Sequence, residues 1–216
     1  MQLWALWTAM AAANEWNVTW ESLRSDSGWT VSYSANESIG TVKVLKKEIN
    51  GFPCFQGQSE TPLAVPVLMS VATDITGAKS WSTAGITKAE VLGQGGGQID
   101  YYQYLDIPFL SDRHWFLRGA IETKGAETRF RWDKLPAGAH SSRIAQLKVE
   151  SSDAVEPPLN IGAWVFLSGD KNTEVRYYIC THPGGSVPAS LQSIGTEKTL
   201  PNNVVDLIVE AQKRSK

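Results

Sequence analysis

The second half of the chain is dominated by segments in which apolar and polar residues alternate, followed by one long amphipathic stretch. The alternation runs through residues 86–92, 98–107, 115–123 and 127–133, and two more strands are expected at residues 161–167 and 173–181. A period of two is typical of β-strands with one buried face. In residues 187–216 the period becomes helical, with an apolar stripe made by Leu200, Val204, Leu207, Ile208 and Ala211. A series of strands without alternating helices argues against a parallel doubly wound sheet.

The first half adds shorter elements to this frame. We expect helices at residues 14–23 and 63–74, and strands at residues 29–34, 41–49 and 52–58. Asn50-Gly51 is the turn signal between the last two strands. Residues 144–149 are a weaker strand candidate. The order predicts an α+β fold in which a curved antiparallel sheet wraps around the C-terminal helix and encloses an apolar cavity.

Composition and motifs exclude several functions. The 216 residues favour one large domain over two small ones, and 20 basic against 22 acidic residues give a net charge of −2. A nucleic-acid binder normally carries a basic surplus, so no such partner is expected. Three histidines and two cysteines show no metal-ligand spacing, and neither a nucleophile elbow nor a phosphate-binding loop is present. We therefore expect no metal, no cofactor and no recognisable catalytic set.

Residues 1–13 are uncharged, apolar and too short to span a bilayer. Their Ala-x-Ala end is typical of a secretory signal, although the basic start is missing. Three interpretations stay open: a truncated signal, the first turns of a packing helix, or a cloning remnant. The protein is expected to be secreted or periplasmic if the segment is a signal remnant, and cytoplasmic otherwise. Residues 14–216 are expected to form the functional domain.

Two stretches of the chain carry a family signal when taken together. YYQYLDIPFLSDRHW at residues 101–115 resembles the aromatic strand and proline turn of START (steroidogenic-acute-regulatory-related lipid transfer) domains. YYICTHPGGSVP at residues 177–188 resembles the last strand of that family and the turn into its C-terminal helix, and Trp81 matches its tryptophan after the second helix. The resemblance covers about residues 14–216 and is closest to bacterial single-domain members. His114 and His182 stand where the family has aspartates.

The resemblance implies the helix-grip fold and a monomeric, non-enzymatic protein that binds a sterol, fatty acid or phospholipid, with transient membrane contact. The alternative is a helix-grip cyclase or aromatase acting on a polyketide. Under the first interpretation the ligand-binding residues would be Asp100, Tyr102, Tyr104, Trp115, Arg118, Trp132, Trp164, Phe166, Leu200, Val204, Leu207 and Ile208. The mouth of the cavity would lie between residues 107–112 and the terminal helix.

Two details of the expected site rest on strand parity. Asp100, Tyr102 and Tyr104 share one strand face. Either this face lines the cavity, which the family resemblance favours, or it meets solvent while Tyr101 and Leu105 fill the core. The family's internal acid–arginine pair falls at Asp100 and, one residue early, near Arg118. If one member of this pair is buried, the other should be buried too.

The two cysteines lie in the third and the last strand of the expected fold. These strands are not expected to be neighbours, and a disulfide needs Cα atoms within about 7 Å. Cys54 and Cys180 are therefore predicted to remain separate thiols.

Overall fold

The computed structural model describes residues 17–107, 110–182, 184–185 and 189–216, the last range from residue 197 on with its side chains. The segment at 1–13 for which a signal remnant was considered lies outside the described residues, as does Trp16. In the described chain the helices are α1 Trp20–Arg24, α2 Val65–Ala72, α3 Ala78–Trp81, α4 Ser141–Glu150 and α5 Ala189–Arg214. None of these helices is both long enough and apolar enough to cross a bilayer.

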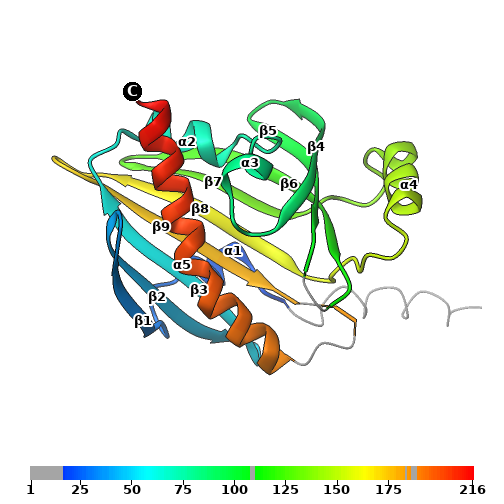
Figure 1. Cartoon of the computed structure of the whole chain (residues 1–216), viewed down its shortest axis with the longest axis horizontal. Coiled ribbons are helices and arrows are strands. Elements are labelled where there is room, and N and C mark those ends of the chain that lie inside the picture. The colour runs from blue at the N-terminus through cyan, green and yellow to red at the C-terminus, as the bar shows by residue number, and fades with distance from the viewer. Residues whose placement is uncertain (1–16, 108–109, 183, 186–188) are drawn as a thin grey trace, which may run out of the picture.

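The described residues form nine strands in a single antiparallel sheet (Figure 1). The strands are β1 Thr30–Glu37, β2 Gly40–Ile49, β3 Phe52–Thr61, β4 Ile86–Gly95, β5 Gln98–Leu105, β6 Arg113–Lys124, β7 Glu127–Lys134, β8 Asn160–Ser168 and β9 Thr173–Thr181. Their order in the sheet is β1-β2-β3-β9-β8-β7-β6-β5-β4. Most connections are therefore hairpins, while β3 pairs with a strand far along the chain.

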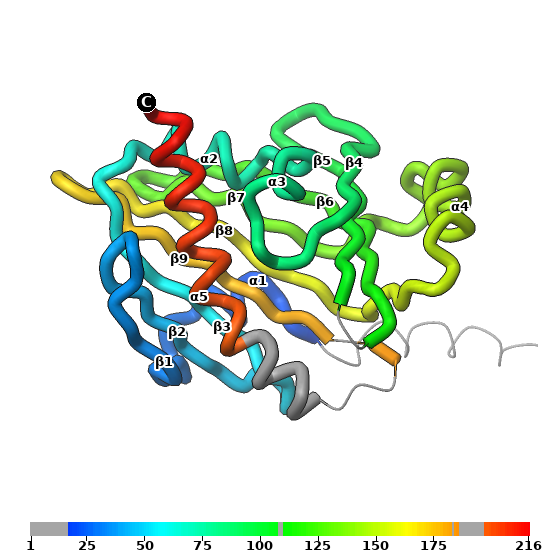
Figure 2. Tube along the Cα trace, in the orientation of Figure 1, coloured from blue at the N-terminus to red at the C-terminus, as the bar shows by residue number. Residues whose placement is uncertain are grey.

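Helix α5 runs obliquely across one face of the sheet, as the ribbon and the tube both show (Figure 1, Figure 2). Leu200, Val204, Leu207 and Ile208 are at most 1% exposed and face the sheet. The prediction of an antiparallel sheet gripped by the C-terminal helix is confirmed. The contact is close at Gly57 of β3, where a Cβ atom would lie 2.7 Å from side-chain atoms of both Leu200 and Val204.

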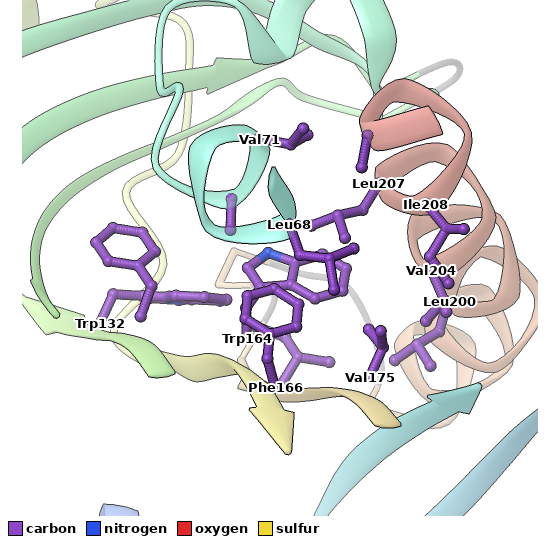
Figure 3. Close-up of a cluster of buried hydrophobic side chains, with 14 of the residues drawn as sticks. Leu68, Val71, Trp132, Trp164, Phe166, Val175, Leu200, Val204, Leu207 and Ile208 are labelled. Carbon is purple, nitrogen blue, oxygen red and sulfur yellow. The ribbon is translucent and has the colours of Figure 1, made fainter. Parts of the chain in front are cut away.

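The main core lies between the sheet, α2 and α5. Figure 3 shows Trp164 and Phe166 of β8 next to Leu68 of α2, with Trp132 of β7 on one side and the apolar stripe of α5 on the other. These residues come from distant parts of the sequence, so burial of their apolar surface ties both halves of the sheet to the two helices.

Residues 144–149, expected as a strand, belong to helix α4, and that prediction is wrong. Ile144 and Leu147 are three residues apart and pack together on one side of this helix. A short run with few apolar residues does not distinguish the two periods. Helix α4 lies against the face of the sheet opposite α5, where Leu147 joins a cluster with Tyr102 and Phe116.

The prediction of two free thiols is also wrong. In the observed sheet β3 pairs with β9, with Phe55 opposite Ile179. This register places Cys54 and Cys180 side by side, their Cα atoms 4.5 Å apart, and they form a disulfide. Both cysteines are fully buried in a second apolar cluster, on the face of the sheet away from α5.

Candidate ligand-binding cavity

A cavity of about 290 Å³ lies between the sheet and helices α2, α3 and α5. Much of its wall is aromatic: Trp81, Tyr101, Trp115, Phe130, Trp132, Trp164 and Tyr177. The volume lies just below the usual range of small-molecule pockets, about 300–1,000 Å³. The space is therefore suited to a small ligand that is largely apolar.

Four of the residues predicted from the sequence line this cavity. They are Trp115, Trp132, Trp164 and Leu200. Four others, Phe166, Val204, Leu207 and Ile208, belong to the same core without lining the cavity. These eight residues come together on one face of the sheet, as the helical stripe and the strand alternation predicted.

Asp100, Tyr102, Tyr104 and Arg118 do not line the cavity, so their predicted placement there is wrong. On β5 the inward side chains are Tyr101, Gln103 and Leu105. Shifting the parity by one residue moves every side chain of a strand to the other face. Tyr102 and Tyr104 point to the opposite face of the sheet, and they are nevertheless buried because the α4 region covers them. Because residues 144–149 were predicted to be a strand, no helix was expected to cover these tyrosines on that face of the sheet.

The acid–arginine pair exists, but on the face away from the cavity. Arg118 donates two hydrogen bonds to the Asp100 carboxylate, at 2.6 and 2.7 Å, and the His140 Nε2 lies 2.8 Å from the same carboxylate. His140 directly precedes α4. The hydrogen bonds from Arg118, aided by His140, hold the pKa of Asp100 below its ordinary value although burial opposes this. The cluster ties α4 to strands β5 and β6.

We expect Asp100→Asn to lower stability at neutral pH and to flatten its acid dependence. A carboxylate with a lowered pKa stabilises the fold fully above its unfolded value of about 4, and this contribution disappears as the pH falls through the lowered pKa. The asparagine variant should therefore lose less stability below about pH 4 than the wild type does. Urea unfolding between pH 7 and pH 2.5 measures this. Parallel curves for the two proteins would contradict the assignment.

Sequence reasoning missed several polar residues of the wall, above all Tyr177, Asn160 and Asn203. The Tyr177 ring stacks on Trp164, with centroids 4.2 Å apart, and Asn160 accepts a hydrogen bond from Trp132 Nε1 at 3.0 Å. Asn203 lies three residues after Leu200 on α5. Its helical spacing from the predicted stripe was the signal that could have found it.

The segment after α3 closes one side of the cavity. Ser82, Thr83 and Ala84 contribute to the wall, and both the backbone amide and the hydroxyl of Thr83 donate to the Asp206 carboxylate of α5, at 2.7 and 2.6 Å. The mouth was expected beside residues 107–112, of which 108–109 lie outside the described residues. The described chain holds no group of three or more His, Cys, Asp or Glu side chains that could bind a metal.

Comparison with solved structures identifies the fold. A STAR-related lipid transfer protein from Xanthomonas axonopodis superposes with a TM-score of 0.69 at 19% identity, over 86% of this chain and 99% of the other. Human StAR-related lipid transfer protein 5 gives 0.74 at 10% identity, over 91% and 92%. The chain therefore has the helix-grip fold of START domains, as the two sequence motifs predicted.

More distant structures share this fold. The Zhui aromatase/cyclase from Streptomyces superposes with a TM-score of 0.51 at 13% identity, over 76% of this chain and 95% of the other. By sequence, the chain is 24% identical over 177 residues to an uncharacterized protein of Pseudomonas aeruginosa, covering 80% of this chain and 83% of that protein. No family model matches the chain.

Proposed function

We propose that this protein is a non-enzymatic carrier or sensor that holds one hydrophobic small molecule in the cavity between sheet and helices. The observation that carries the proposal is the aromatic cavity in a START fold. Each 100 Å² of apolar ligand surface removed from water contributes about 2.5 kcal/mol before the costs of association. A space of this kind therefore supplies affinity without ionic contacts.

The volume bears on the ligand class. If one heavy atom takes roughly the 30 Å³ that a water molecule occupies in the liquid, then 290 Å³ corresponds to about ten heavy atoms. That size favours a single short chain or a small ring system over a phospholipid with two acyl chains.

The second candidate function is a cyclase, because an aromatase/cyclase shares the fold. General acid–base catalysis is most efficient when the catalytic pKa lies near the working pH. The described cavity wall contains no carboxylate, histidine, lysine or arginine. Burial raises the pKa of Tyr101 and Tyr177, which moves them further from neutrality. These features favour the carrier.

We further propose that the protein works in an oxidising compartment. The Cys54–Cys180 disulfide supports this, because disulfides persist mainly in secreted and periplasmic proteins. Protein alkylated during lysis of its native source should contain no alkylated cysteine. Alkylation of both residues would instead indicate a reducing compartment.

Extraction of the purified protein with organic solvent, followed by mass spectrometry, tests the carrier proposal directly. We expect about one equivalent of a single class of small hydrophobic molecule. Turnover of polyketide substrates without a retained ligand would favour the cyclase.

Filling part of the cavity should weaken this binding. Ala72, at the end of α2, lines the cavity, and Ala72→Phe would occupy part of the volume. We expect the affinity for octan-1-ol, followed by quenching of the wall tryptophans, to fall at least tenfold. Ala145→Phe, on an exposed position of α4, is the matched control and should bind as the wild type does. Unchanged binding by Ala72→Phe would place the ligand elsewhere.

A further inference from the structure

We propose that the cavity selects uncharged ligands, and that the hydroxyl groups of Tyr101 and Tyr177 hold the ligand's single polar atom, a hydroxyl or carbonyl oxygen. This inference rests on the proposed function and names the ligand class of the same cavity. Three observations carry it: the charge of the wall, the state of the two tyrosines, and the unpaired polar atoms beside them.

The first observation is that no carboxylate, histidine, lysine or arginine side chain of the described residues faces the cavity. Every described side chain in its wall is apolar or neutral, the polar ones being serine, threonine, asparagine, glutamine, tyrosine and tryptophan. Asp100 and Arg118, each next in sequence to a wall residue, pair with each other on the opposite face of the sheet. An ionised ligand would therefore lose its hydration without meeting an opposite charge.

The segments outside the described side chains do not change this conclusion. Residues 108–109, 183 and 186–196 contain no Asp, Glu, Lys, Arg or His, and residues 1–16 contain only Glu15. The part of the chain that continues α5 towards its N-terminus is thus as neutral in sequence as the described wall.

The second observation concerns the two tyrosines. Tyr101 lies on β5 and Tyr177 on β9, which are separated in the sheet by β6, β7 and β8. Burial raises the pKa of both hydroxyls well above the ordinary value, so both stay protonated, and their mutual proximity raises that of Tyr101 further. Among the described residues neither hydroxyl has a hydrogen-bond partner.

The rings that carry these hydroxyls are held in place by aromatic neighbours. Tyr177 stacks on Trp164, and the Tyr101 ring lies 6.3 Å from that of Phe130. Little side-chain entropy remains to be lost when a ligand binds, so the two hydroxyls form a preorganised polar site. A ligand oxygen that meets them can donate to one and accept from the other.

The third observation is that the same wall holds other unpaired polar atoms. The indole Nε1 atoms of Trp81 and Trp115, and Oδ1 of Asn203, are buried and have no partner among the described residues. Buried polar groups without partners are rare in folded proteins, because each one costs folding free energy. A neutral ligand with polar character would offset this cost in a way that a hydrocarbon would not.

The test compares three ligands with the same chain length on the full, delipidated protein at pH 7.5: octan-1-ol, octanoate and octylammonium. Tryptophan fluorescence or calorimetry gives the affinities. We expect octan-1-ol to bind at least tenfold more tightly than either ion. Equal or tighter binding of octanoate or octylammonium would overturn the selection for neutral ligands.

Isosteric variants test the anchor. Tyr101→Phe and Tyr177→Phe should each weaken octan-1-ol binding by about three- to tenfold, the usual effect of one lost hydrogen bond. Butylbenzene, which has no polar atom, should bind both variants at least as well as it binds the wild type, because removing a hydroxyl leaves the apolar wall intact. Tyr33→Phe, on the exposed edge strand β1, is the matched control and should change nothing.

The outcomes distinguish failure of the tyrosine anchor from failure of the proposed function. Unchanged octan-1-ol affinity in both tyrosine variants would remove the anchor. An equal loss for butylbenzene and octan-1-ol would mean that the substitutions disturb the cavity itself, which also overturns the anchor. If the wild type binds none of the neutral probes and releases no ligand on extraction, the proposed function fails, and this inference fails with it.

Discussion

Protein denatured without reductant should contain no free thiol, and breaking the Cys54–Cys180 bridge should lower the unfolding temperature by about 10–20 °C. The bridge joins residues 126 positions apart. In the chain-entropy model, closing a loop of that length restricts the unfolded chain by about 5 kcal/mol. For a domain of this size each kcal/mol corresponds to about 2–4 °C.

Thiol titration in guanidinium before and after reduction checks the bridge itself. Calorimetry of Cys54→Ala, Cys180→Ala and the double variant checks its energetic contribution. Since either single substitution already breaks the bridge, the second should add little beyond its own lost packing. Two fully additive single losses would mean that the two cysteines contribute as separate buried side chains and not as a bridge.

The substitution Gly57→Val should separate helix α5 from the sheet and destabilise the protein by about 3 kcal/mol, the upper part of the usual range for overpacking. The new Cβ atom would lie 2.7 Å from side-chain atoms of Leu200 and Val204, two fully buried members of the core. Both have branched ends and little room to turn, so either the helix moves or the strand bends.

Gly95→Val provides the matched control, because a Cβ atom at that strand position meets nothing within 4 Å. Urea unfolding gives the stability of each variant, and limited proteolysis reports whether α5 detaches. Gly57→Ala should show a smaller loss of the same kind. Equal stability of the two valine variants would show that the helix is not held as closely as the structure indicates.

The parts of the fold that sequence reasoning predicted have strong periodicity and sufficient length. The stripe from Leu200 to Ala211 has one apolar face over three helical turns, and it faces the sheet as expected. Strands β4 to β7 were recognised because apolar and polar residues alternate along each of them. Their antiparallel arrangement followed from the absence of helices between most of them.

Sequence reasoning missed the features that depend on which elements pack against a strand. Strand β5 is buried on both faces along most of its length, so its sequence pattern does not indicate which side chains point towards the cavity. Assigning Tyr102 and Asp100 to the correct face required knowing that α4 is a helix packed on the outer side. The disulfide was missed for a related reason, because the pattern within each strand says nothing about which distant strand becomes its neighbour.

The pairing of β3 with β9 also affects how the protein is made. Phe55 pairs with Ile179, a residue that leaves the ribosome 124 positions later. At about 5–20 residues per second, the edge of β3 stays unpaired for on the order of ten seconds during synthesis. Apolar residues of β3 remain without their final partners during that time, so long-range pairing of this kind makes folding slow and aggregation a hazard for the nascent chain.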